Sequence, residues 1–199
     1  FITVNAGPTA GFTSSTNGAT ASFTNTSGNA VSYTWNFGDG QNATTQNPTH
    51  TYAADGTYTV TLTATNPCGT NTFTQNVTIL TPPTAAFTAT PLSGCGPLTV
   101  QFTSNSSANA VTYNWLFPGG NPASSSAQNP TVVYNTPGTY TVTLTVSNGA
   151  GSNTAAQQSY ITVNPGPTAG FTSSVNGATV SFTNTSGNAV SYSWAFGDG

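Results

Sequence analysis

Residues 33–40, Tyr-Thr-Trp-Asn-Phe-Gly-Asp-Gly, are the stretch of sequence that decides the fold. The aromatic residues Tyr33, Trp35 and Phe37 alternate with polar ones, and a period of two is typical of a half-buried β-strand. The Gly-Asp-Gly that follows is typical of a turn, because glycine and aspartate tolerate the backbone angles that turns need. We therefore expect a core strand that carries a Trp and ends at a tight turn.

This strand belongs to a long internal repeat. Residues 1–40 align with residues 160–199 at an offset of 159, and 34 of the 40 positions are identical. A weaker period of about 80 residues lies inside the long one, since residues 113–120 echo residues 33–40. The sequence thus alternates two domain types, and the pair of domains is the repeating unit.

Proline-bearing junctions separate the domains. Proline fixes its own φ and restricts the residue before it, so we expect short, stiff spacers and a rigid rod. The first and last segments match only parts of a domain, and we expect the natural protein to continue in both directions. The expected organisation is the last strand of a preceding domain at 1–5, a type 1 domain at 6–81, a type 2 domain at 82–164 and a partial type 1 domain at 165–199.

Alternation of period two runs through the rest of the chain, and no stretch has helical spacing. In residues 58–64 the apolar side chains share one face and the threonines the other, which gives a polar surface without charge. About seven short strands per 80 residues, with a Trp on the third, predict an all-β fold of tandem immunoglobulin-like β-sandwich domains. The predicted core residues are Tyr33, Trp35, Phe37, Tyr58, Tyr113, Trp115, Phe117, Tyr140 and Trp194.

The charge composition narrows the function. The chain has no Lys or Arg, and its acids are Asp39, Asp55 and Asp198. Nucleic-acid binding and a basic membrane-surface mode are excluded, because both need cations. We expect no membrane insertion, since no apolar run reaches about 20 residues. Charged residues make up 2% of the chain, against about 25% in typical soluble proteins, which indicates an extracellular or cell-surface protein.

Three motifs carry a family resemblance. Residues 35–40, 47–52 (Asn-Pro-Thr-His-Thr-Tyr) and 56–60 (Gly-Thr-Tyr-Thr-Val) together resemble the signature of PKD (polycystic kidney disease) domains. The second domain departs from it, with Pro-Gly-Gly at 118–120 and Val-Val-Tyr at 132–134. The resemblance implies β-sandwiches that serve as spacer, adhesive or stalk modules in bacterial surface and secreted proteins. Large Thr/Asn-rich arrays of this kind are similar to secreted repeat proteins of Bacteroidetes.

Few residues could carry chemistry. His50 lies on a predicted strand, and catalysis there would need a nucleophile and an orienting acid nearby. The second domain has no equivalent histidine, so we expect no catalysis, no cofactor and no enzyme. Asp39 and Asp198 each follow the core strand of a type 1 domain. Calcium usually takes several oxygen ligands, so turn-stabilising hydrogen bonds are favoured over a metal site. The Trp residues share faces with apolar neighbours, which favours core packing over a sugar-binding platform.

The two cysteines lie in different domains. Cys68 lies in the predicted loop between the last two strands of the first domain, and Cys95 in an enlarged loop between the first two strands of the second. These loops lie at opposite poles of an immunoglobulin-like sandwich, which in an extended pair exceeds the Cα distance of about 7 Å that a disulfide allows. We hypothesise a disulfide from each Cys95 to the Cys68 equivalent of the following unit. An interchain bridge and free buried thiols are the alternatives.

The sequence is best interpreted as a structural segment of a long extracellular filament, stalk or adhesin fibre. Low charge lets copies of the chain associate laterally, so the expected partners are other copies of itself in a multi-chain bundle. Two alternatives stay open: an array that binds glycan or another surface, and spacer domains of a secreted hydrolase. In the filament interpretation, a tip outside this segment would bind a host or prey surface, or a glycan.

Overall fold

The computed structural model describes residues 5–197. Every regular element in this range is a β-strand, and no helix occurs among these residues. The chain divides into two compact units, and the first of them extends to Pro83 and also takes in Ser147–Ser152. The strand predicted at residues 1–5 falls largely outside the described range, as does Asp198.

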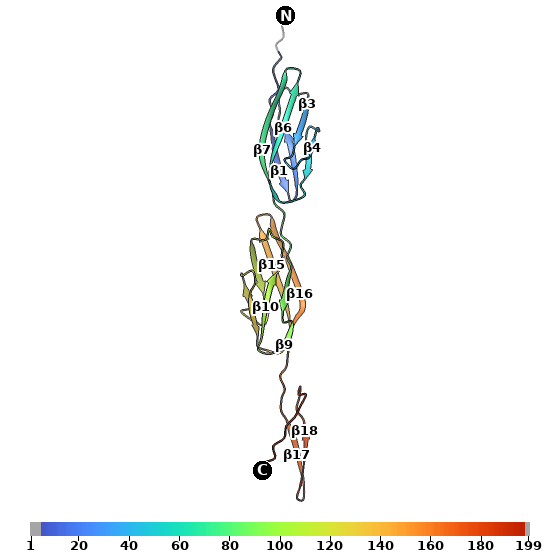
Figure 1. Ribbon diagram of the computed structural model, residues 1–199, viewed down its shortest axis with the longest axis vertical. Coiled ribbons are helices and arrows are strands. Elements are labelled where there is room, and N and C mark those ends of the chain that lie inside the picture. The colour runs from blue at the N-terminus through green and yellow to red at the C-terminus, as the bar shows by residue number, and fades with distance from the viewer. Residues whose placement is uncertain (1–4, 198–199) are drawn as a thin grey trace. The chain divides into compact units, whose positions relative to one another are not determined.

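The first domain is a sandwich of two antiparallel sheets (Figure 1). One sheet has the order β1 (Phe12–Asn17), β2 (Thr20–Asn25) and β5 (Thr49–Thr51). The other has the order β4 (Asn42–Ala43), β3 (Ser32–Asn36), β6 (Gly56–Asn66) and β7 (Gly69–Ile79). The expected alternation is present in β6, where Val60, Leu62 and Ala64 are buried and the threonines between them are not.

The second domain repeats this plan with additional short strands. One sheet has the order β12 (Gly120–Asn121), β14 (Thr131–Tyr134), β10 (Leu98–Ser104) and β8 (Phe87–Thr90). The other has the order β13 (Ser124–Ser125), β11 (Thr112–Leu116), β15 (Gly138–Asn148), β16 (Gly151–Asn164) and β9 (Ser93–Cys95). The strand β9 replaces part of the loop that the sequence predicted around Cys95, and it pairs in parallel with the end of β16 (Figure 1).

Each complete domain is built around one Trp. Trp35 is fully buried against Phe12 and Phe23, with ring centroids 5.0 and 5.4 Å away. Its indole Nε1 donates a hydrogen bond to the carbonyl of Thr45 at 3.0 Å, so the polar edge of the ring is satisfied inside the domain. Trp115 occupies the equivalent place and donates to Ala127 at 2.9 Å. The prediction of tandem immunoglobulin-like β-sandwiches is confirmed.

The other predicted core residues fall into two groups. Phe37 and Phe117 are buried, whereas the tyrosines are partly buried and pack against the outside of the two cores. These partly buried residues are Tyr33, Tyr58, Tyr113 and Tyr140. A Tyr at these positions can bury its ring and keep its hydroxyl at the rim, where Tyr58 Oη donates to the carbonyl of Ala54 at 2.9 Å.

The third repeat consists of a two-stranded sheet and the segment that follows it. Its strands are β17 (Phe171–Asn176) and β18 (Thr179–Asn184). Trp194, which the sequence placed in a core, is 39% exposed. In the first domain Trp35 lies on β3, which pairs with β6 in a four-stranded sheet, whereas the described residues 165–197 contain only the strands β17 and β18.

Candidate functional site

The most polar cluster of the first domain joins Asp39 to His50. Asp39 follows β3 and His50 lies on β5, and their Oδ2 and Nε2 atoms are 2.7 Å apart. The two side chains are 17% and 9% exposed, respectively. The imidazole stacks on Phe37 with ring centroids 4.2 Å apart and planes 4° from parallel. The pair therefore packs against the aromatic core through the stacking of His50 on Phe37.

The surroundings of Asp39 favour its charged form. Burial alone would raise the pKa of Asp39, but the hydrogen bonds from His50 and from the backbone N–H of Gln41 outweigh it and lower the pKa below 3.8. The Gln41 N–H lies 3.0 Å from Asp39 Oδ1, so both carboxylate oxygens are engaged. In the second domain Val132 stands in place of His50 and Gly119 in place of Asp39.

The contact between Asp39 and His50 is not predicted by the sequence pattern. The two residues are 11 positions apart, and they meet because the sheet that contains β5 packs against the sheet that contains β3. Among residues 5–197, no group of three or more His, Cys, Asp or Glu side chains could hold a metal ion. Asp39 thus hydrogen-bonds both to the turn that follows β3, through the Gln41 N–H, and to His50 on β5.

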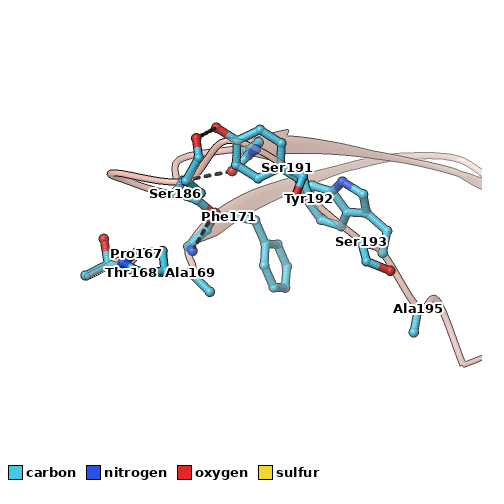
Figure 2. Close-up of a pocket in the computed structure, with 13 residues that line it drawn as sticks. Pro167, Thr168, Ala169, Phe171, Ser186, Ser191, Tyr192, Ser193 and Ala195 are labelled. Atoms are coloured by element: carbon cyan, nitrogen blue, oxygen red, sulfur yellow. Dashed lines mark hydrogen bonds between the residues drawn. The ribbon is translucent and has the colours of Figure 1, made fainter. Parts of the chain in front are cut away.

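A hollow of about 440 Å³ is the second candidate, and it lies in the third repeat. Figure 2 shows it along the sheet, with Phe171 and Tyr192 among the residues that line it. Phe171 is 60% exposed, whereas its equivalent Phe12 is 5% exposed in the first domain. The ring centroids of Phe171 and Phe182 are 5.8 Å apart, as are those of Phe12 and Phe23.

The hollow is therefore one half of a sandwich interior. Its aromatic residues repeat core positions of the first domain and keep the same mutual packing. They differ in lacking the facing sheet. The exposed rings of this repeat, Phe171, Phe182, Tyr192, Trp194 and Phe196, are for this reason interpreted as uncovered core residues and not as a sugar-binding platform.

The cysteines occupy two separate surface sites. Cys68 lies in the turn between β6 and β7, where its Sγ donates a hydrogen bond to the carbonyl of Asn5 at 3.4 Å. Cys95 is the last residue of β9 and faces Asn164 across the parallel pair. Both are exposed free thiols. The predicted disulfide needs partners in adjacent units, so it stays a prediction.

The sequence also missed an asparagine that ties the incoming chain to each complete domain. Asn66 Nδ2 donates to the carbonyls of Ala6 and Asn29 at 2.9 and 2.7 Å. Asn148, its equivalent, donates to the carbonyl of Thr81 at 2.8 Å. The recurrence of Asn just before the Gly-bearing turn of the longest hairpin was the available signal.

Comparison with known proteins gives a consistent result. A family model described as PKD domain matches residues 3–81 and 80–163. The pre-pro-metalloprotease PrtV of Vibrio cholerae is 41% identical over 85 residues, which are 40% of this chain and 9% of that protein. The collagenase ColA of Bacillus cereus is 61% identical over 36 residues, 18% of this chain and 4% of that protein. The chain thus spans less than a tenth of either relative.

One solved structure also matches a part of this chain the size of one domain. The crystal structure of the PKD1 domain from the Vibrio cholerae metalloprotease PrtV is 40% identical, with a TM-score of 0.37, and its match covers 38% of this chain and 100% of that one.

No helix in the described residues is long and apolar enough to cross a membrane.

Proposed function

Because the chain belongs to the PKD domain family, we propose that it is a non-catalytic spacer segment of a secreted protein such as a hydrolase. The observation that carries this proposal is the size of the matches. Two relatives named as a metalloprotease and a collagenase share with the chain stretches of 85 and 36 residues, which are 9% and 4% of their lengths. A module that is reused as so small a part of larger enzymes fits a role in positioning other domains.

The junction residues support a spacer that holds its geometry. Asp55 Oδ1 accepts hydrogen bonds from the backbone N–H and the hydroxyl of Thr81 at 3.0 and 2.9 Å. Asn148 donates to the carbonyl of the same residue. Thr81 is followed by two prolines, which limit the backbone angles available to the junction. The N–H, the hydroxyl and the carbonyl of Thr81 are thus all hydrogen-bonded, which reduces the freedom of this linker residue.

Small-angle X-ray scattering of the chain tests the spacer geometry. The 11 residues of β6, at about 3.3 Å each, give a domain about 36 Å long. A stiff spacer is expected to show a maximum dimension near the sum of its domain lengths, unchanged between low and high salt. A compact particle, or a broad distribution of dimensions, would contradict the proposal.

The sequence encoded on either side of residues 1–199 tests which kind of protein the chain belongs to. A spacer in a secreted hydrolase predicts a secretion signal and a catalytic domain in the same frame. Further copies of the 159-residue pair without a catalytic domain would instead favour a fibre.

The fibre is a second candidate, and one observation favours it. The pair of domains repeats with 34 of 40 positions identical over residues 1–40 and 160–199, which is what a long uniform array needs. The chain also carries no Lys or Arg, so repulsion between copies is weak. Sedimentation velocity over a wide concentration range is expected to show self-association in this case, whereas a monomer at every concentration argues for an isolated spacer.

A further inference from the structure

Cys95 lies on an outward-facing strand edge beside the last residue of its domain. In β9, Gly94 faces the interior, because a Cβ there would lie 2.6 Å from Leu98 Cδ1. Successive residues of a strand face opposite sides, so Cys95 faces out. Its partner in the parallel pair is Asn164, and neighbouring strands lie about 4.8 Å apart. Cys95 and Asn164 are therefore immediate cross-strand neighbours.

Cys68 is held against the residue that precedes its own domain. Its Sγ donates to the carbonyl of Asn5 at 3.4 Å. The turn around Cys68 is fixed, because its backbone N–H donates to Asn66 Oδ1 at 2.8 Å and Asn66 Nδ2 donates to the carbonyl of Ala6. The thiol is exposed beside Asn5.

Asn5 and Asn164 are the same position of the repeat, 159 residues apart. The beginnings of the two type 1 domains also fold alike, with the bridge between Thr9 and Gly28 in one and between Thr168 and Gly187 in the other. A completed third domain therefore brings its own copy of Cys68 to the carbonyl of Asn164. We propose that Cys95 and the Cys68 equivalent of the following type 1 domain form a disulfide beside Asn164.

The junction that leads from a type 1 to a type 2 domain has neither of the two cysteines. At the position of Cys68, the second domain has Ala150. The first hairpin of the first domain is tight, with Asn17 paired to Thr20, and has no insertion like the one that contains β9. The covalent link is thus specific to the junction that leads from a type 2 to a type 1 domain.

The oxidation is balanced by an external disulfide. The two thiols lose two protons and two electrons as the S–S bond forms, and a low-molecular-weight disulfide such as oxidised glutathione takes them up by thiol–disulfide exchange and leaves as two thiols. An oxidising location rests on the proposed function, whereas the pairing of the cysteines rests on the geometry. An experiment in a defined redox buffer therefore tests the pairing separately.

The test uses the chain with a copy of its residues 41–81 attached after Gly199, which completes the third repeat as a type 1 domain. Oxidation in a glutathione buffer and peptide mapping without reduction are expected to link Cys95 to the attached copy of Cys68, while the original Cys68 keeps a free thiol. A link between Cys68 and Cys95, a dimer of chains, or free thiols at both expected positions would overturn the proposal.

Matched variants separate the bond from folding. In the completed chain, Cys68→Ser is expected to leave the link intact and Cys95→Ser to abolish it, with the same blue-shifted Trp194 emission in both. Two variants of the original chain test each half of the geometry alone. Asn164→Cys is expected to trap Cys95, and Asn5→Cys to trap Cys68. Failure of either trap would overturn the proposal even if the completed domain did not fold.

Discussion

Two tyrosines at the same position of the two domain types differ in one hydrogen bond. Tyr52 Oη donates to the carbonyl of Phe37 at 3.1 Å inside the first domain. Tyr134 Oη is buried and has no hydrogen-bond partner, and the carbonyl of Phe117 accepts the backbone N–H of Gly120. Burial raises the pKa of each phenol to about 12, so both are protonated donors at neutral pH.

The same substitution should consequently have different effects in the two domains. We expect Tyr52→Phe to destabilise the first domain by about 1 kcal/mol, since it removes a satisfied buried hydrogen bond. Tyr134→Phe is expected to be neutral or stabilising, because it removes an unpaired buried hydroxyl. Amide hydrogen exchange of each domain measures both effects in one chain, and equal losses in the two domains would contradict the assignment.

The Asp39–His50 pair makes the first domain sensitive to acid. The pKa of Asp39 is lowered in the folded state, so its carboxylate contributes stability fully above its ordinary pKa of 3.8 and loses it as the pH falls through the lower folded value. We expect Asp39→Asn to lower the urea midpoint of this domain at pH 6. The difference from the wild type should shrink toward zero as the pH falls below 3.8. A difference that stays constant with pH would show that the carboxylate charge is irrelevant.

At the scale of the element, the β6–β7 hairpin carries the attachment of the incoming chain. Asn66 makes three hydrogen bonds from the end of this hairpin. We expect Asn66→Ala to destabilise the first domain by about 1–2 kcal/mol and to raise amide exchange around Ala6. Thr72→Ser, an exposed position on the same hairpin, is the control and should change stability by less than about 0.5 kcal/mol. Equal effects would remove the special role of Asn66.

The strands with clear alternation could be predicted from the sequence, and β9 could not. The core strand around Trp35 and the Thr-rich β6 were predicted because one face of each is apolar and the other polar. The segment around β9 reads Ser-Gly-Cys-Gly-Pro, which is typical of a loop. It pairs with Thr162 to Asn164, residues distant in sequence, and no local pattern encodes that pairing.

The candidate site was predictable only in part for a similar reason. That Asp39 stabilises a turn followed from its place after the core strand, but its partner His50 depends on how two sheets close over Phe37. The asparagine ties of Asn66 and Asn148 join residues 60 or more positions apart. Contacts of this length depend on the finished fold, which the period-two pattern alone does not specify.

At the scale of the whole molecule, equivalent aromatic residues are buried where the two sheets of a sandwich face each other and exposed where only β17 and β18 are described. The third repeat carries nearly the same residues as the first, and yet Trp194 is 39% exposed where Trp35 is 0% exposed. The aromatic half-core keeps its internal packing without the second sheet. Burial of the core is thus a property of two facing sheets and not of the strand that carries the Trp.

The parallel pairing of β9 with β16 also has a mechanical consequence. Tension applied to the two ends of the second domain pulls these parallel strands in opposite directions, so their hydrogen bonds are loaded in shear, together, and not one after another. The described part of the first domain contains antiparallel pairs alone. Single-molecule pulling should therefore show type 2 domains rupturing at higher force than type 1 domains, and Gly94→Pro, which disrupts β9, should remove the difference. In an array of the two types, the type 1 domains would unfold first under tension, and their extension would protect the type 2 domains.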